Sequence, residues 1–201
     1  MEEVIIATKN SGKAKEFERI FHEKGMIVKT LLDFPEIEDV EETGTTFEEN
    51  AKIKSETIAN LLGKMVIADD SGLEVDALEG RPGVYSARYA GPQKNDEENI
   101  DKVLEELHGV PKNERTARFR CVLSVSQPGK KTVTFAGACE GLILTERKGT
   151  NGFGYDPIFF IEAKGKAMAE LAPEEKNKIS HRAMAIKKLE QNLTLNFGED
   201  S

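Results

Sequence analysis

The stretch "VIIATKNSGKAKEF" (residues 4–17) predicts a strand, a short polar loop and a helix in immediate succession. Its apolar start favours a strand, and the polar residues after it favour a loop. Phe17, Ile20 and Phe21 then follow at the i, i+3, i+4 spacing of one helical face, so we expect a helix over about residues 13–23. This order of elements is typical of an α/β fold.

The loop of this stretch has the residue types of an anion-binding site. Its relevant residues are Thr8, Asn10, Ser11, Gly12 and Lys13. Free N–H groups at a helix N-terminus attract anions, the lysine adds charge, and the glycine permits close approach of the backbone. The loop is not a Walker A motif, because Ala7 and Ala14 stand where that motif has glycine and serine or threonine. An ordinary turn, in which Asn10 or Ser11 only caps the helix, remains the alternative.

Further helices and strands are predicted along the rest of the chain. The apolar stripe from Phe47 to Leu62 favours a helix that Gly63 ends, and "MVIADDSG" favours a buried strand over residues 65–68 followed by a polar turn. The segment "NDEENIDKVLEELHGV" has the pattern of an amphipathic helix. Alternating residues over 116–125, followed by the turn "QPGK", favour an antiparallel hairpin or meander.

The last part of the chain completes a mixed α/β pattern. "DPIFFI" predicts a short strand that sends Phe159 and Phe160 to the core, and a helix is expected to start near Ser180. We therefore expect a single two-lobed domain over residues 1–197 and a disordered tail over residues 198–201.

Composition limits the class of protein. With 38% hydrophobic and 32% charged residues, the 201-residue chain is typical of a globular protein, and its net charge of −8 argues against nonspecific nucleic-acid binding. The sequence has neither a signal-peptide pattern nor an apolar run approaching the roughly 20 residues of a membrane helix, so we expect a cytoplasmic protein without membrane contact. Cys121 and Cys139 are expected to be buried, reduced thiols.

Two neighbouring acids follow the predicted strand in "VIADDSG". An α/β protein places its active site at such a strand end, which would present Asp69, Asp70 and Ser71. Adjacent side chains on a strand point to opposite faces, so only one aspartate can enter a given cleft, and the other is expected to cap a turn. A metal site and an Asx-turn are both compatible with this stretch.

Acidic residues also precede the helix that starts near Phe47. Glu41 and Glu42 belong to a run that would mostly form a solvated face. A carboxylate from this run could enter a phosphate site only through a divalent cation, because direct contact would be repulsive. Mg²⁺ suits one or two carboxylates together with phosphate oxygens and water.

Two later segments also contain candidate binding residues. Phe153 lies between Gly152 and Gly154, which leave it little cover, so its ring is a candidate for stacking on a base. His181 and Arg182 fall in the first turn of the last helix, where the helix dipole disfavours cations. A bound anion or carbonyl-rich ligand would offset this cost, and so would a nearby acidic side chain.

These segments together resemble the inosine triphosphate pyrophosphatase family, the Ham1-like nucleoside triphosphate pyrophosphatases. The residues that carry the resemblance are, in order, "ATKNSGK", "EETGTTFEENAKIKS", "ADDSGL", "GVYSARYAG", "GFGYDPIF" and "EEKNKISHR". The resemblance covers about residues 3–195. It implies a long, strongly twisted mixed sheet with flanking helices, two lobes around a central cleft, and a homodimer.

The resemblance also implies an activity. The expected reaction is hydrolysis of a purine nucleoside triphosphate between the α- and β-phosphates, with Mg²⁺ as cofactor and the monophosphate and pyrophosphate as products. ITP, dITP and XTP are the expected substrates. Their oxygen at position 6 would accept hydrogen bonds from donors that an adenine amine would leave unpaired. Guanine shares this oxygen, and the sequence does not explain how it would be excluded.

The family's roles carry over to individual residues. Asp70 would be the general base or position the water, and Glu42 and Asp70 would bind the metal, with Glu41 as the alternative to Glu42. The residues implied to bind substrate are Thr8, Lys9, Asn10, Ser11, Gly12, Lys13, Lys54, Ser71, Phe153, Gly154, Tyr155, Asp156, Lys176, His181 and Arg182. Lys176, His181 and Arg182 would recognise the purine, and Arg88 would support the cleft or the dimer.

Other functions are compatible with the same residues. A noncatalytic regulator built on the same loop would bind ITP and leave it intact. A related pyrophosphatase for modified pyrimidine nucleotides would reverse the substrate preference. A covalent mechanism is disfavoured, because His22 and His108 lie on predicted helices as surface residues and no Ser-His-Asp or Cys-His arrangement is evident.

Overall fold

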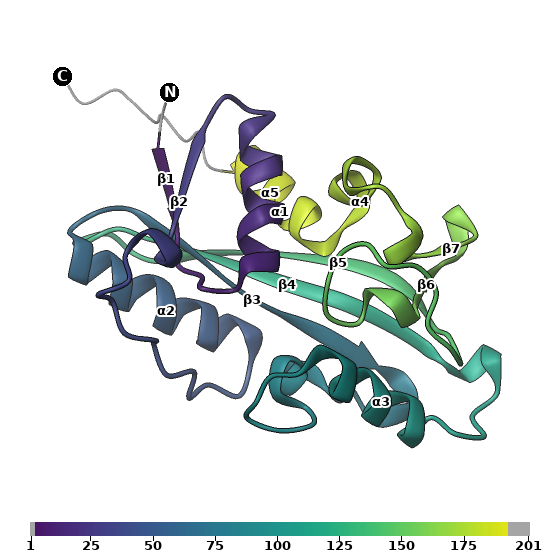
Figure 1. Ribbon diagram of the computed structural model, residues 1–201. Helices are drawn as coiled ribbons and strands as arrows, with labels where there is room; N and C mark the ends of the chain where they lie inside the picture. The colour runs from purple at the N-terminus through teal and green to yellow at the C-terminus, as the bar shows by residue number, and fades with distance from the viewer. Residues whose placement is uncertain (1–2, 193–201) are drawn as a thin grey trace. The chain divides into compact units, whose positions relative to one another are not determined.

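The computed structural model describes residues 3–192, so the predicted tail over residues 198–201 lies outside the described residues. The strands are β1 (Glu3–Ile6), β2 (Ile27–Thr30), β3 (Val66–Val75), β4 (Thr116–Ser126), β5 (Val133–Ile143), β6 (Phe159–Ile161) and β7 (Lys166–Ala167). The α-helices are α1 (Ser11–His22), α2 (Phe47–Leu62), α3 (Asp96–Glu106), α4 (Pro173–Ile179) and α5 (His181–Asn192). Figure 1 shows the path of the chain through these elements.

The strands form one mixed sheet. Their order is β2-β1-β3-β4-β5-β6-β7. β1 pairs in parallel with β2 and with β3, whereas β6 is antiparallel to β5 and β7. The predicted mixed α/β fold with flanking helices is therefore confirmed. The strong twist, the two lobes and the cleft implied by the resemblance stay predictions.

Contacts divide the described chain into two compact units, each built from separate segments. The first unit contains residues 3–70, 121–137 and 182–192, and the second contains residues 71–120 and 138–181. Strands β3, β4 and β5 each contribute residues to both units.

In the first unit, helices cover both faces of the strands. Alternate residues of β1 point to opposite faces. Val4 and Ile6 pack with apolar residues of α1 and α5, whereas Ile5 packs with Ile58 of α2. Figure 1 shows α2 on the opposite side of the strands from α1 and α5. β1 thus lies between two packed layers, and the β1–α1 loop, which carries most of the predicted phosphate-binding residues, follows its end.

The second unit has a core of its own. Ile100 and Val103 of α3, together with Leu107 directly after its last residue, pack against β3, β4 and the β6 region, and all three side chains are fully buried. The buried Arg115 guanidinium ties this core to the chain around it, since it donates hydrogen bonds to the backbone carbonyls of Leu107, Val110, Ile143 and Leu144 at 2.8–3.3 Å.

Helix ends follow the sequence signals, but one strand differs from its prediction. Helix α2 ends at Leu62, and Gly63 follows in the left-handed conformation with φ 64°. β3, however, continues through Asp69 and Asp70 to Val75, whereas the sequence predicted a polar turn after residue 68. The four polar letters "DDSG" resemble a turn, yet Lys13 and Arg182 lie beside Asp69 and make charge within a strand tolerable.

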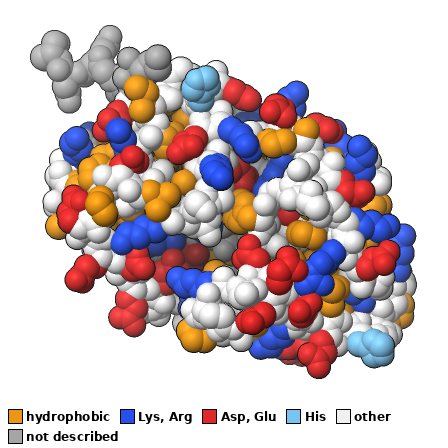
Figure 2. Space-filling view, in the orientation of Figure 1, with side chains coloured by type: hydrophobic (Ala, Val, Ile, Leu, Met, Phe, Trp, Pro, Cys, Tyr) orange, Lys and Arg blue, Asp and Glu red, His pale blue; other side chains and the backbone are white. Residues whose placement is uncertain are grey.

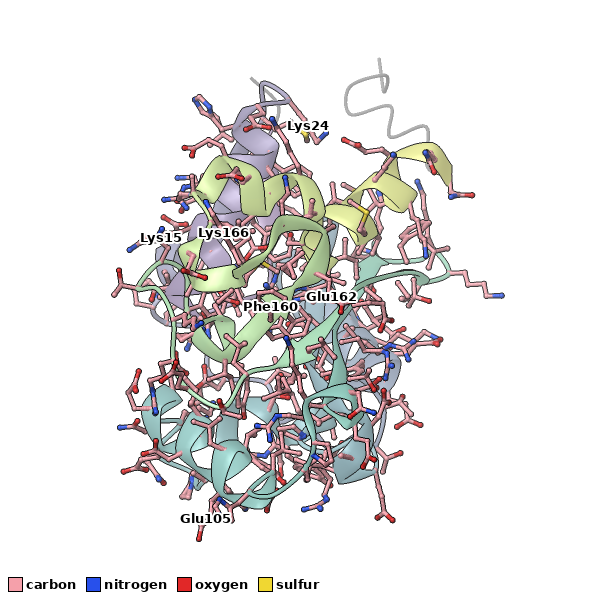
Figure 3. All side chains as sticks on the ribbon, turned by 90° about the vertical axis from the view of Figure 1, so that its right-hand side faces the viewer. Lys15, Lys24, Glu105, Phe160, Glu162 and Lys166 are labelled. Carbon is pink, nitrogen blue, oxygen red and sulfur yellow. The ribbon has the colours of Figure 1, made fainter. Side chains whose placement is uncertain are left out.

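Other local predictions are mostly confirmed. Cys121 and Cys139 are buried free thiols, and His22 and His108 are exposed. Phe159 is fully buried, but the prediction that Phe160 would also enter the core is wrong. Phe160, labelled in Figure 3, is half-buried because neighbouring strand residues point to opposite faces.

The visible surface is mixed in charge. Acidic and basic side chains are interspersed over the face seen in Figure 2, without a continuous basic area on that face. None of the helices within residues 3–192 has the length and apolar character needed to span a membrane.

Candidate active site

The predicted site residues form two sets, one in each unit. The first unit holds the β1–α1 loop together with Glu42, Lys54, Asp70 and Arg182, and the second unit holds the remaining candidates. The residues of the second set are Ser71, Phe153, Gly154, Tyr155, Asp156, Lys176 and His181.

In the first set, the β1–α1 loop leads directly into helix α1. Asn10 is the N-cap, and its Oδ1 accepts a hydrogen bond from the N–H of Lys13 at 2.9 Å. The N–H of Asn10 donates to Thr8 Oγ1 at 3.1 Å, which closes the turn before the helix. Ser11 is exposed and Gly12 is half-buried. The ordinary capping role of Asn10 is therefore present, and it leaves the helix N-terminus available for an anion.

Lys9 in the loop and Lys13 in the first turn of α1 have different partners. Lys13 Nζ lies 3.3 Å from Asp69 Oδ2. Lys9 Nζ instead donates to the backbone carbonyl of Ile37 at 2.5 Å and lies 3.1 Å from Asp39 Oδ1. The resemblance implied that Lys9 binds substrate, but its ammonium is engaged by the 37–39 segment.

Asp69, which the sequence left as a turn cap, lies at the centre of a buried charge network. Arg182 Nε lies 3.4 Å from Asp69 Oδ2, and Arg182 Nη1 lies 3.1 Å from Glu16 Oε2. The turn-cap prediction for Asp69 is wrong, because the side chain faces Lys13 and Arg182 from within β3. Of the two explanations for Arg182 in a first helical turn, the nearby acidic side chain is present.

Glu42 and Lys54 form the second charged pair of the first unit. Lys54 Nζ lies 2.8 Å from Glu42 Oε1 and donates to the backbone carbonyl of Asp69 at 2.5 Å. Burial opposes ionisation of Glu42, yet the Lys54 ammonium holds the pKa of Glu42 below its ordinary value. Burial would likewise lower the pKa of Lys54, but Asp69, Glu42 and Asp70 together raise it. Both side chains therefore stay charged.

Asp70 has the ionisation behaviour expected of a base. Burial raises the pKa of Asp70 to about 6, the charges of Glu42 and Asp69 add to this rise, and Lys54 and Lys13 oppose it. A carboxylate with a pKa of about 6 is ionised at neutral pH but accepts a proton more readily than an ordinary aspartate. Asp70 is only 4% exposed, so its carboxylate is largely shielded from bulk water.

The donors of the first unit fit a magnesium ion that is shared with a substrate. Glu42 and Asp70 supply carboxylate oxygens, and the effect of Glu42 on the pKa of Asp70 reflects their proximity. Within residues 3–192, no group of three or more acidic, histidine or cysteine side chains forms a metal cage. Mg²⁺ bound through one or two carboxylates plus phosphate oxygens needs no such cage. Glu41 is exposed, which favours Glu42 as the ligand.

In the second set, Lys176 links an acid and an aromatic ring. Lys176 Nζ lies 2.8 Å from Asp156 Oδ2 and 4.7 Å from the centroid of the Phe153 ring. Asp156 Oδ2 also accepts a hydrogen bond from the N–H of Phe153 at 3.2 Å. Lys176 and Asp156 are buried, whereas Phe153 is half-buried. The half-buried ring keeps the accessible surface that stacking on a base requires.

The turn around Phe153 depends on Gly152. This residue has φ 76°, and a Cβ there would lie 2.0 Å from Asp156 Oδ2. The N–H of Gly154 donates to Asp96 Oδ2 at 2.9 Å. Tyr155 packs in the core and its hydroxyl donates to the carbonyl of Ser86 at 2.7 Å, so its side chain supports this turn.

The remaining two candidates of the second unit lie on different elements. Ser71 follows Asp70 in β3 and is half-buried. His181, the first residue of α5, is 4% exposed, and its ring stacks on Phe119 with centroids 5.0 Å apart. The predicted helix start after Ser180 is confirmed.

Glu16 is a residue that the sequence analysis missed. It is 4% exposed although it is charged. A signal was available, since Glu16 precedes Ile20 by four residues and so lies on the apolar stripe of the predicted helix. A charge on such a stripe requires a buried partner, which is Arg182.

A family model and known relatives match the sequence over nearly the whole chain. The model of the Ham1 family matches residues 4–192. This chain belongs to the Ham1 family. The dITP/XTP pyrophosphatase of Bacillus subtilis is 60% identical over 189 residues, which is 94% of this chain and 96% of the relative. The dITP/XTP pyrophosphatase of Halalkalibacterium halodurans is 58% identical over 95% of this chain and 98% of the relative.

Solved structures agree with this membership of the Ham1 family. The Ham1 protein of Staphylococcus aureus is 49% identical to this chain with a TM-score of 0.83, and covers 94% of this chain and 97% of its own. A HAM1 protein from Coxiella burnetii is 41% identical with a TM-score of 0.84, over 96% and 99%. The Ham1 family and the mixed sheet with flanking helices are thus confirmed.

Proposed function

We propose that this chain hydrolyses deaminated purine nucleoside triphosphates, namely ITP, dITP and XTP, to the monophosphate and pyrophosphate. The observation that carries the proposal is the buried Asp70, with a pKa raised to about 6, beside Glu42, Lys13 and Lys54. Relatives with 58–60% identity that are named dITP/XTP pyrophosphatases support the same reaction. Removing these nucleotides would clear deaminated purines from the nucleotide pool.

The first unit would bind and cleave the triphosphate. The N-terminus of α1 and the ammonium groups of Lys13 and Lys54 would bind the phosphate oxygens, on which charge builds up in the transition state. Asp70 would orient the attacking water and accept its proton. Thr8, Asn10, Ser11 and Gly12 would hold the loop and offer N–H groups to the phosphates.

Magnesium is the proposed cofactor, held by Glu42 and Asp70. When bound, Mg²⁺ would neutralise phosphate charge and lower the pKa of the attacking water. Lys54 would support this metal site from outside it, because its ion pair holds Glu42 in place.

The second unit would recognise the nucleoside. Phe153 would stack on the base, Gly154, Tyr155 and Asp156 would form its turn, and Ser71 would contact substrate beside Asp70. Lys176 and His181 would donate to the oxygen at position 6. Arg182 would also contribute to recognition of the purine, although its guanidinium already pairs with Glu16 and Asp69.

A nucleotide panel with Mg²⁺ tests the reaction. ITP, dITP and XTP should release pyrophosphate with an equal amount of monophosphate, and ATP should release little. Release of orthophosphate, or preferred cleavage of modified pyrimidine nucleotides, would contradict the proposal. ITP that binds tightly and stays intact would identify a noncatalytic regulator.

The variant Asp70→Asn tests the proposed base. We expect turnover to fall at least about a thousandfold, since general-base assistance and a metal ligand are both lost. Affinity for ITP measured by calorimetry without Mg²⁺ should stay within about threefold, because the N-terminus of α1, Lys13 and Lys54 remain. A variant with full activity would remove Asp70 from the mechanism.

Assembly and location are the last parts of the proposal. We expect a homodimer, as the resemblance implies, and action in the cytoplasm, where nucleoside triphosphates are used. Light scattering coupled to size exclusion should give twice the 22.3 kDa mass of the chain. The mass of one chain would contradict the dimer.

A further inference from the structure

Lys9 in the β1–α1 loop and Lys13 in the first turn of α1 lie four residues apart, yet their ammonium groups have different environments. The side chain of Lys13 is 17% exposed and pairs with the buried Asp69. Asp69 directly precedes the proposed base Asp70 in β3, so the ion pair places the Lys13 ammonium at this end of the site. The side chain of Lys9 is 33% exposed and pairs with Asp39. The difference indicates that only one of these lysines belongs to the phosphate site.

Lys9 is bound by a segment that lacks helix and strand. The short 3₁₀ helix at Leu31–Asp33 ends before this segment, and α2 starts after it at Phe47. Both contacts of the Lys9 ammonium are with this segment: one is with the carbonyl of Ile37 and the other with the carboxylate of Asp39. An ammonium has three donors, so two of the three are used here.

The same segment presents the proposed metal ligand. Ile37, at 5% exposed, anchors it in the core of the first unit, and Glu42 follows Asp39 by three residues. Three residues span at most roughly 10 Å, so fixing Asp39 limits where Glu42 can lie. At its other end, Lys54 holds Glu42 through an ion pair of 2.8 Å. Lys9 thus joins the phosphate loop to the segment that carries Glu42.

We propose that Lys9 is a positioning residue that holds the 37–42 segment, and with it Glu42, against the phosphate loop, and that it is not a phosphate ligand. This inference rests on the proposed function, in which Glu42 binds the metal. It reassigns one residue that the resemblance had placed among the substrate contacts.

Binding of tripolyphosphate without metal separates the two roles of Lys9. Calorimetry would compare the wild type with Lys9→Met, Lys13→Met and Lys15→Met. Lys15 is the matched control, because it lies on α1, is exposed, and points away from the helix in Figure 3. We expect Lys13→Met to lose at least about tenfold in affinity, and Lys9→Met and Lys15→Met to stay within about twofold. An equal loss in Lys9→Met and Lys13→Met would overturn the proposal.

Binding of Mn²⁺ in the presence of tripolyphosphate measures the positioning itself. Electron paramagnetic resonance counts free Mn²⁺, and we expect its dissociation constant to rise about three- to tenfold in Lys9→Met, where a charged hydrogen bond and an ion pair are both lost. Lys15→Met should leave the constant unchanged. An unchanged constant in Lys9→Met would overturn the proposal.

A double-mutant cycle assigns the effect to the contact with Asp39. Asp39→Asn should raise the Mn²⁺ dissociation constant in the same direction, and Lys9→Met/Asp39→Asn should be no worse than Lys9→Met alone. Glu38→Gln, a neighbouring exposed acid, is the control and should change nothing. Additive losses in the double variant would overturn the proposal. These arms need no turnover, so the nucleotide panel, which tests the proposed function, can fail independently.

Discussion

Asp69 and Asp70 are neighbours of one residue type with opposite environments. Adjacent side chains of β3 point to opposite faces. Asp69 faces the cations of Lys13 and Arg182, whereas burial raises the pKa of Asp70 to about 6. The sequence singled out both acids, and the resemblance favoured Asp70 as the base. Neither could place Asp69, because the residues that pair with Asp69 are distant in sequence.

The raised pKa of Asp70 predicts a stability effect at this residue. Because protonation of Asp70 is easier in the folded state, Asp70 favours folding below about pH 4 and disfavours it as pH rises through about 6. A rise in the pKa of Asp70 from 3.8 to about 6 corresponds to a loss of about 3 kcal/mol in the free energy of unfolding when Asp70 is ionised. Asp70→Asn should therefore be more stable than the wild type by up to about 3 kcal/mol at pH 8 in metal-free buffer.

Urea unfolding at pH 4 and pH 8 measures this difference. The two proteins should be nearly equally stable at pH 4, where Asp70 is protonated in the folded state. Glu41→Gln, a change at an exposed acid, is the control and should have little effect at either pH. An Asp70→Asn variant that is less stable than the wild type at pH 8 would contradict the raised pKa.

At the scale of elements, α2 was predictable from end to end and β3 was not. The signals of α2 are local: Thr46 caps its start together with Glu49, and Gly63 follows its last residue. Helix α2 also carries Lys54, so the position of this lysine depends on where the helix begins and ends. The length of β3 depends instead on partners from other segments, among them Lys13 and Arg182.

The start of α2 gives a prediction at this scale. Thr46 Oγ1 accepts a hydrogen bond from the N–H of Glu49 at 3.1 Å, and its loss in Thr46→Ala should lower the free energy of unfolding by about 1 kcal/mol. Thr57→Ala lies in the same helix on an exposed face and is the matched control, expected within about 0.5 kcal/mol of the wild type. Equal effects of the two changes in denaturant unfolding would exclude the capping role.

For the molecule as a whole, both units are assembled from segments that are far apart in sequence. β3, β4 and β5 each supply residues to the two units. If one unit unfolded, part of each of these three strands would unfold with it, and the other unit would lose the continuation of its own strands. This sharing predicts that the described chain unfolds in one cooperative transition.

The tyrosines provide a direct test of cooperative unfolding. Tyr85, Tyr89 and Tyr155 are the chain's three tyrosines, all lie in the second unit, and the chain has no tryptophan. Tyrosine fluorescence thus reports on the second unit alone, whereas far-ultraviolet circular dichroism reports on the helices of both. The two signals should give the same urea midpoint. Phe159→Leu in the second core and Ile58→Val in the first should each shift both signals together. Separate midpoints would show that the units unfold independently.

The sequence by itself determined the local elements and the chemistry that the chain can offer. Helical spacing, caps and glycines located α1 and α2, and local patterns marked Lys13, Asp70 and Phe153 as candidates. The roles of Glu42 and Asp70 rest instead on the resemblance to the Ham1-like family. Such features are encoded by residues within a few positions of one another, so a single sequence is sufficient to predict them.

Only the tertiary structure decided how the charges are paired. Arg182 meets Glu16 and Asp69, and Lys9 meets the 37–39 segment rather than sharing the environment of Lys13. A buried charge needs an opposite charge or hydrogen-bond partners within a few ångströms. Which segment supplies them depends on how distant parts of the chain pack, and that packing leaves no local pattern in the sequence.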